Sequence, residues 1–405
     1  MMRTVGSKAL TAAALAMTMA LPGQAAEPVV KIGILTDMSG PYSDMGGPGS
    51  VAAAQLAIDD CLAAECKGMT IELLQADHQN KADIGAQKAR EWADVNKVSA
   101  IADLTNSAVA LGVQKLTVEH NFVAMYSGPA TTKLTNEDCS PNGFHWMFDT
   151  YALAAGSAQA ITKMGGKSWY FVTVDYAFGH SLEADSAAMV TAAGGTVVGS
   201  VRHPLNAPDM SSFLLSAQSS SAGVIALANG AADTINAIKT AREFGIVQSG
   251  KQVVPLLIFL SDIRSLGLEA AQGLTFTEGF YWDQDDQTRA FAARFQKAFQ
   301  NRKPTMVQAG VYSSVLHYLR SAAAAKTTEA KVVAAKMREL PIRDAVMHHP
   351  AIRPDGRVIH DMLLVKVKTP AESKGDWDYY TIQATIPAAD AFRPLDKSAC
   401  PLVKG

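Results

Sequence analysis

Two short polar segments carry the side chains best suited to hold a small anion. Thr105-Asn106-Ser107 follows one expected strand, and Ser127-Gly128-Pro129-Ala130-Thr131-Thr132 follows the next. In open α/β sheets ligands bind at the carboxyl ends of the strands, and helix N-termini favour carboxylates. The alternative is that Ser107 and Thr131 only cap helices, and the two roles are compatible. The sequence therefore predicts a carboxylate site at these segments.

Aromatic and acidic side chains follow several other expected strands. Asp175-Tyr176-Ala177-Phe178-Gly179 ends a strand in the second half of the chain, where its rings either cover a ligand or pack a loop. Asn229-Gly230-Ala231 and Leu260-Ser261-Asp262 end two more strands, and Tyr281-Trp282 comes later. We expect these segments to face the first two across a shared cleft.

The patterns of the common enzyme classes are missing from the sequence. It contains no G-x-S-x-G, H-E-x-x-H or G-x-x-x-x-G-K-[ST] motif. Gly46-Gly47-Pro48-Gly49 precedes a helix, but Pro48 lacks the N–H that a phosphate loop needs, so a tight turn near a ligand is the better interpretation. The nine histidines form no ligand pattern, and no C-x-x-C pair occurs. We expect no enzyme, no cofactor and no metal site.

The N-terminus has the layout of a secretory signal peptide. Arg3 and Lys8 precede an apolar run from Ala9 to Leu21, and Ala25-Ala26 offers a cleavage site. The run is too short for a membrane span of about 20 residues, although an N-terminal anchor is the alternative. Removing residues 1–26 changes the net charge from −2 to −4. We therefore expect a periplasmic protein with no nucleic acid partner.

Four cysteines in an exported chain indicate two disulfides. Three pairings are possible. We favour Cys61 with Cys66 and Cys139 with Cys400, and free buried thiols are the alternative. The long bridge would tie the C-terminal tail to the region between two lobes.

Strand and helix patterns alternate along most of the chain, which predicts parallel sheets with helices on both faces. Two consecutive series of this kind, in about 380 mature residues, imply two lobes. A last segment differs, because Met362–Lys368 and Tyr379–Ile382 suggest an antiparallel pair. The expected strands are 29–37, 70–76, 99–104, 122–126, 168–174, 196–201, 223–228, 253–259 and 273–282.

The order of these segments resembles a known family. The chain contains VKIGILTDMSGPYSDMGGPGSVAAAQLAIDD, ADLTNSAVALGVQKL, SGPATTKLTNEDCSP, VDYAFGHSL and NGAADTINAIKTAREFGI, in this order. This series is similar to the periplasmic Leu/Ile/Val-binding protein family, the substrate-binding subunits of ABC importers. The resemblance implies a type I periplasmic binding fold of the α/β class: two doubly wound α/β lobes around a ligand cleft, joined by three crossovers.

The resemblance also implies lobe boundaries and partners. Lobe 1 would span 27–147 plus 278–355, lobe 2 would span 148–277 plus 356–392, and 393–405 would form a C-terminal tail. The expected protein is a monomer that binds a small molecule and docks on an ABC permease in the inner membrane. An exported ligand sensor and an exported hydrolase with an unrecognised nucleophile are the other classes.

The resemblance further implies a pocket for a small carboxylate. Ser107 and the N–H groups of residues 128–131 would hold the carboxylate, and Asp262 would hold an ammonium if the ligand has one. Gly230 has no ring where the family has an aromatic, and Ala130 has no hydroxyl, which leaves an aromatic carboxylate or amide as the alternative to an apolar amino acid. The expected ligand contacts are Tyr42, Ser43, Met45, Ser107, Gly128, Ala130, Thr131, Phe178, Gly230, Asp262, Tyr281 and Val307.

Overall fold

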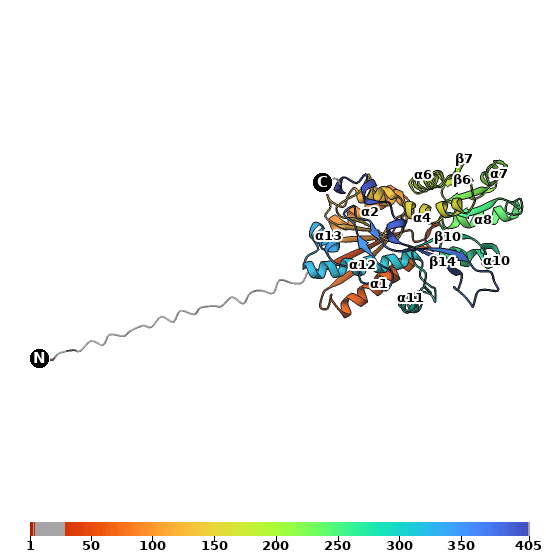
Figure 1. The fold of residues 1–405 in the computed structure, drawn as a ribbon. Coiled ribbons are helices and arrows are strands. Elements are labelled where there is room, and N and C mark those ends of the chain that lie inside the picture. The colour runs from red at the N-terminus through yellow and green to blue at the C-terminus, as the bar shows by residue number, and fades with distance from the viewer. Residues whose placement is uncertain (3, 5–28, 404–405) are drawn as a thin grey trace.

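The computed structural model describes residues 1–2, 4 and 29–403. The expected signal peptide and its cleavage site near Ala25-Ala26 therefore lie almost wholly outside the described residues. Within them, helices and strands form two lobes, which Figure 1 shows side by side. No helix of the described residues is long and apolar enough to cross a membrane.

Lobe 1 is built on a five-stranded parallel sheet, whose inner strands β1, β3 and β4 are almost wholly buried. The strand order is β2-β1-β3-β4-β5. Helix α1 packs along α12, and α2 packs on α3. The elements are β1 (Val30–Thr36), α1 (Gly47–Ala63), β2 (Ile71–Asp77), α2 (Ala82–Glu91), β3 (Ala100–Asp103), α3 (Ser107–Gln114), β4 (Val123–Tyr126), β5 (Gly143–His145), α11 (Asp286–Ala298), α12 (Met306–Ala325) and α13 (Ala330–Glu339).

Lobe 2 contains a four-stranded parallel sheet of order β7-β6-β8-β9. The strand expected over 253–259 ends at Pro255, and a helix begins at Leu260. Its elements are α4 (Thr150–Gly156), α5 (Ala158–Lys163), β6 (Ser168–Val174), α6 (Ala177–Ala192), β7 (Thr196–His203), α7 (Ser211–Ser219), β8 (Val224–Ala228), α8 (Ala232–Glu243), β9 (Gln252–Pro255), α9 (Leu260–Leu266) and α10 (Leu268–Ala271).

A third sheet joins late segments of the chain to lobe 2. Strands β10 (Thr275–Glu278), β13 (Met362–Val367) and β14 (Tyr380–Ile386) pair antiparallel in the order β10-β13-β14. The antiparallel pair predicted from the sequence is confirmed. Helix α4 packs on β10 and β13, which fixes this sheet to lobe 2. The predicted lobe boundaries stay predictions.

Both predicted disulfides are present in the structure. Cys61 is bonded to Cys66, and Cys139 is bonded to Cys400 across 261 positions of sequence. The second bridge brings the tail, which follows α14 (Ala388–Ala391), back to lobe 1. The chain therefore carries a covalent tie between its C-terminal end and the first lobe.

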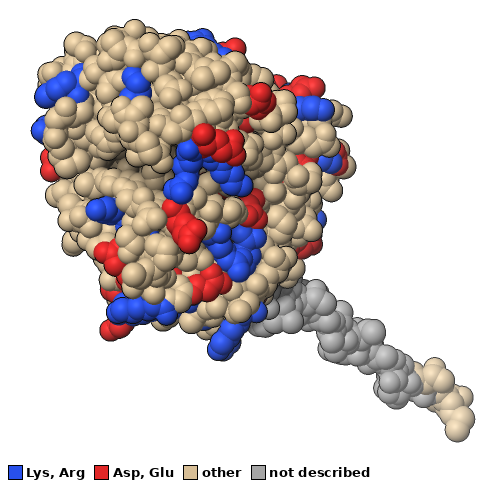
Figure 2. Space-filling view, turned by 90° about the vertical axis from the view of Figure 1, so that its right-hand side faces the viewer, with Lys and Arg blue, Asp and Glu red and all other residues tan. Residues whose placement is uncertain are grey.

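Arg357 holds the crossover segments between the lobes. Its side chain is fully buried and donates to the backbone oxygens of Val358 and Phe148, at 3.0 and 3.1 Å. The carboxylate of Asp149 lies 3.6 Å from the guanidinium. A buried cation that satisfies main-chain oxygens on two segments holds those segments together. On the face shown in Figure 2, basic and acidic side chains lie beside one another.

Candidate functional site

A small cavity lies between the lobes, at the carboxyl ends of the parallel strands. The volume available to the centre of a water molecule is only about 10 Å³, so the cavity has room for about one water. Among the described residues, those that line it carry no formal charge at neutral pH. They are Tyr42, Met45, Thr105, Ser107, Gly128, Ala130, Tyr176, Phe178 and Leu257.

The loop that carries Tyr42 is held from behind by Asp37, at the start of the β1–α1 connection. The Asp37 carboxylate accepts hydrogen bonds from the N–H of Gly40 at 2.6 Å and of Tyr42 at 2.9 Å. The side-chain amide of Asn80 donates to the same carboxylate at 2.6 Å. A carboxylate with several N–H donors is a strong anchor. The Asp37 carboxylate thus holds the backbone of Tyr42 in place at the edge of the cavity.

The other end of the same loop is anchored by the N-terminus of α12. Thr305 and Gln308 form a reciprocal capping box, which defines where α12 begins. The Thr305 hydroxyl also donates to the Met45 oxygen at 2.6 Å, and the Gln308 amide donates to the Gly46 oxygen at 3.2 Å. A helix distant in sequence therefore sets the place of Met45 in the cavity wall.

Ser107 is buried at the start of α3, with its hydroxyl beside the segment after β4. Its Oγ accepts from the N–H groups of Ala130 and Thr131, each at 3.3 Å. A hydroxyl has two acceptor lone pairs and one proton. Both lone pairs are therefore occupied, and the proton is left to donate into the cavity. The helix cap itself is Asn106, whose side chain accepts from the N–H groups of Ala108 and Val109.

This geometry changes the expected roles of two groups. The N–H groups of Ala130 and Thr131 bond within the protein, so the free donor toward a ligand is the Ser107 hydroxyl. The alternative interpretation, that Ser107 only caps the helix, is wrong, because Asn106 precedes it and takes both N–H donors.

Three hydrogen bonds join the lobes around the cavity. The hydroxyls of Tyr42 and Tyr176 are 2.7 Å apart, and burial raises the pKa of the Tyr42 hydroxyl well above its ordinary value. Thr131 Oγ1 lies 2.8 Å from the hydroxyl of Ser181. Thr132, the next residue, donates to Asp185 at 3.2 Å. Helix α6 and its cap supply the lobe 2 partner in all three bonds, so the structure has its lobes in contact along one face of the cleft.

A buried acid lies directly beneath the cavity floor. Asp103 is fully buried, and burial raises the pKa of its carboxyl to about 7. A Cβ added to Gly46 or Gly128 would meet this carboxyl at 2.8 Å. Glycine at both positions therefore allows the loops after β1 and β4 to close over Asp103.

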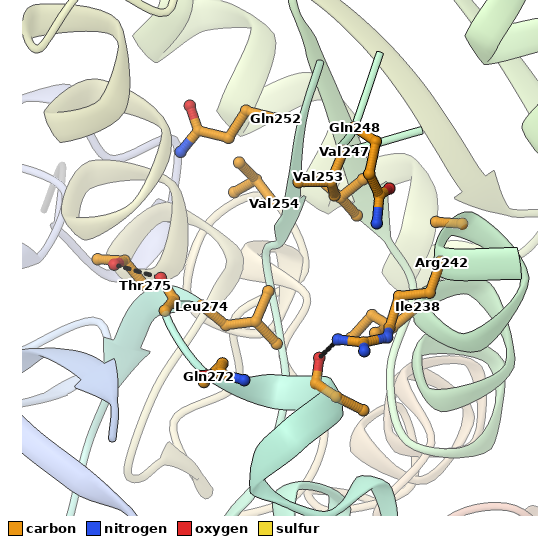
Figure 3. A pocket seen from close by; sticks show the side chains of 13 residues that line it. Ile238, Arg242, Val247, Gln248, Gln252, Val253, Val254, Gln272, Leu274 and Thr275 are labelled. Atoms are coloured by element: carbon orange, nitrogen blue, oxygen red, sulfur yellow. Dashed lines mark hydrogen bonds between the residues drawn. The ribbon is translucent and has the colours of Figure 1, made fainter. Parts of the chain in front are cut away.

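A wider pocket lies elsewhere in lobe 2, between α8, β9 and α10 (Figure 3). About 270 Å³ of it is open to the centre of a water molecule. It borders Gln252 at the amino end of β9, whereas Leu257 of the cleft follows the carboxyl end. The Arg242 side chain at its rim donates to the Glu269 oxygen at 2.8 Å. This pocket therefore lies at the opposite end of β9 from the cleft.

Comparison with known proteins agrees with this geometry. Residues 29–376 match the periplasmic binding protein family. The chain belongs to this family. The type I periplasmic binding fold expected from the sequence is confirmed, and the chain is a solute-binding protein of the kind that serves ABC transporters.

Solved structures of this family overlay closely on the chain. A periplasmic binding protein from Burkholderia mallei is 46% identical, with a TM-score of 0.89 over 92% of this chain and 98% of that one. A branched-chain amino acid ABC transporter periplasmic ligand-binding protein from Burkholderia xenovorans LB400 is 39% identical, with a TM-score of 0.82 over 92% and 100% of the two chains. A curated relative from Brucella melitensis, Leu/Ile/Val-binding protein homolog 6, is 27% identical over 76% of this chain and 80% of its own length.

More distant family members share the fold. A solute-binding protein of an ABC transporter from R. palustris, solved in complex with 4-hydroxybenzoate, is 20% identical, with a TM-score of 0.80 over 90% of this chain and 98% of that one.

Half of the ligand contacts that the family resemblance implied lie on the cavity wall. The other six lie off the wall, and their roles as ligand contacts stay predictions. The contacts on the wall are Tyr42, Met45, Ser107, Gly128, Ala130 and Phe178.

Two of the six lie directly behind the wall. The Thr131 hydroxyl bonds across the cleft and caps the short helix that follows it. A Cβ at Gly230 would contact the side chains of Leu257 and Phe178, at 3.5 and 3.8 Å. These residues therefore support cavity residues.

The other four side chains are used within the fold. Ser43 donates to a backbone oxygen of its own turn at 2.7 Å, and Val307 is fully buried in the core. Asp262 turns back to accept from the N–H of Phe259 at 3.0 Å, as the third residue of α9. The Tyr281 ring packs at a tilt on that of Tyr380 in the core of lobe 2, with the ring centroids 4.9 Å apart.

Three cavity residues were absent from the expected contacts. Thr105 and Tyr176 belong to segments that the sequence had already marked as strand ends, so the signal was present. Leu257 fell inside an expected strand, and no pattern separated it from core residues. It lies in the connection between β9 and α9, on the cavity wall.

Proposed function

We propose that this protein captures a small carboxylate in the periplasm and delivers it to the permease of an ABC importer of the branched-chain amino acid type. The lobes part to admit the ligand and close on it by a hinge motion. The closed form would then dock on the permease. No bond of the ligand is made or broken.

The observation that carries this proposal is the polar wall of the cavity. The Ser107 hydroxyl has both lone pairs filled by N–H groups of the protein, so toward a ligand it acts as a donor. Donors facing an enclosed, water-poor space favour a ligand group that only accepts, and a carboxylate is such a group. The surrounding wall from Met45, Phe178 and Leu257 suits an apolar body.

An apolar amino acid is the first ligand candidate, because the curated relatives carry the name Leu/Ile/Val-binding protein homolog. An aromatic carboxylate is the second candidate, and the cavity lining favours it. A buried ammonium needs an anionic partner, and among the described lining residues none is acidic. The rings of Tyr42, Tyr176 and Phe178 offer surfaces for an aromatic body.

Calorimetric titration of the mature protein tests the proposal. Leucine, phenylalanine, benzoate and 4-hydroxybenzoate are each titrated, with leucinamide and benzamide as partners in which an amide replaces the carboxylate. We expect at least one acid to bind and its amide to bind at least about 10-fold more weakly, since the amide NH₂ would meet donors. An amide that binds as tightly as its acid would contradict the carboxylate site.

The oligomeric state and the export are also proposals. We expect a monomer, which light scattering on the purified protein measures. Cleavage near Ala25-Ala26 is checked by the N-terminal sequence of protein isolated from the periplasm. An exported sensor would have the same cleft, and loss of ligand uptake on deletion of the gene separates import from sensing.

A further inference from the structure

Thr105 lies on the cavity wall with an unusually complete set of partners on its protein side. Its Oγ1 accepts from the backbone N–H of Asp37 at 3.1 Å. The Nε2 atom of His78 also lies 3.1 Å from Oγ1, and both groups are buried. The direction of this second bond depends on which nitrogen of His78 carries the proton.

The backbone of Asn80 decides the tautomer of His78. Its N–H points at His78 Nδ1 over 3.0 Å, and a main-chain N–H can only donate, so Nδ1 must be the acceptor. A neutral imidazole with an accepting Nδ1 carries its proton on Nε2. Burial lowers the pKa of His78 to about 4, although the carboxylates of Asp37 and Asp77 oppose this shift. At neutral pH the ring is therefore uncharged and donates from Nε2 to Thr105.

Two donors now fill both lone pairs of Thr105 Oγ1, which leaves only its proton free. The other hydroxyl in reach is Thr36 Oγ1, and at 3.5 Å it is at the limit of a hydrogen bond. We propose that His78 is a positioning residue, which fixes the Thr105 hydroxyl as a donor to the carboxylate of the ligand. This inference rests on the proposed function and adds a second oriented hydroxyl to that of Ser107.

The consequence is selectivity for the anion. Thr105, in the connection after β3, and Ser107, the first residue of α3, line the same cavity, and each has its acceptor capacity used up by N–H donors. A carboxylate offers an oxygen to each hydroxyl. A neutral amide would direct its NH₂ at one of them, where no acceptor is available.

The tautomer is tested without any ligand. Long-range ¹⁵N–¹H correlation spectra of the mature protein at pH 7 report which imidazole nitrogen carries a proton, and the His78 signals are assigned with the His78→Gln variant. We expect a neutral ring protonated on Nε2. A proton on Nδ1, or a charged ring, would overturn the proposal that His78 donates to Thr105, whatever the ligand is.

Titration with benzoate and with leucine tests whether the Thr105 hydroxyl donates to the ligand. We expect Thr105→Val to weaken binding of the acid that the wild type takes by about 10-fold or more, and Thr105→Ser to stay within about 3-fold. His78→Leu should weaken binding several-fold, and His78→Gln, which keeps an N–H donor, should recover most of the loss. Denaturant unfolding of each variant verifies that it is folded.

A double-mutant cycle tests whether His78 affects ligand binding through Thr105 or through a general structural role. If His78 acts through Thr105, then His78→Leu has no further effect on affinity in the Thr105→Val background. An equal loss in both backgrounds would overturn the proposal, as would unchanged affinity in Thr105→Val. Failure of the wild type to bind any of the four acids would count against the proposed function, and the tautomer measurement would still decide whether His78 donates to Thr105.

Discussion

Replacing Ser107 by alanine should cause two separate losses, one in folding and one in ligand binding. The hydroxyl accepts from the buried N–H groups of Ala130 and Thr131, and alanine leaves both donors unsatisfied. An unsatisfied buried donor costs about 1–3 kcal/mol. Because both bonds are long, at 3.3 Å, we take the lower end for each and expect the free energy of unfolding to fall by roughly 2 kcal/mol.

The same substitution removes a donor to the carboxylate of the ligand. Hydrogen bonds to charged groups contribute about 1.5–3 kcal/mol, which corresponds to a rise of about 10- to 150-fold in Kd. Guanidinium unfolding measures the first loss, and calorimetric titration with the acid that binds the wild type measures the second. The titration is made under conditions in which the variant is almost fully folded, so that the folded fraction does not limit binding.

Ser43→Ala is the matched control for Ser107→Ala. Ser43 is in the opening loop, but its hydroxyl bonds a backbone oxygen of its own turn and does not line the cavity. We expect its affinity to stay within about 2-fold of wild type and its stability to change by about 1 kcal/mol or less. Unchanged affinity in Ser107→Ala would refute the reasoning and move the carboxylate site elsewhere.

Three further predictions concern groups around the cleft and the tail. Burial raises the pKa of Asp103 to about 7, so its contribution to stability is present at low pH and is lost as the pH rises from about 4 to 7. In the Asp103→Asn variant the unfolding free energy should therefore depend less on pH between about 4 and 7. An unaltered pH profile would contradict this prediction. Asp262→Asn should leave the affinity for leucine unchanged, because the carboxyl caps its own helix; loss of leucine binding would restore the predicted ammonium role. Replacing Cys139 and Cys400 together by serine should lower the unfolding free energy by about 2–5 kcal/mol, and equal stability in the oxidised wild type and the variant would show that the bridge is not a constraint.

The parts of the fold that the sequence predicted are those set by local patterns. Alternating apolar strands and amphipathic helices repeat in two series, and the parallel pairing of such units follows from the connections. The antiparallel pair near the C-terminus was also readable from its alternation. The short strand β5 and the helices α4 and α5 were not predicted, since three buried residues and two brief helical turns leave little periodic signal.

The sequence by itself determined that this chain has two α/β lobes, two disulfides and polar strand ends that meet at a cleft, because each depends on residue type and spacing along the chain. Only the tertiary structure decided which polar side chains reach that cleft. The Asp262 carboxyl accepts from the N–H of Phe259, Asn106 rather than Ser107 caps α3, and Leu257 lines the cavity. Each outcome is a competition for one hydrogen-bond partner or one space, and it is settled by distances between segments far apart in sequence.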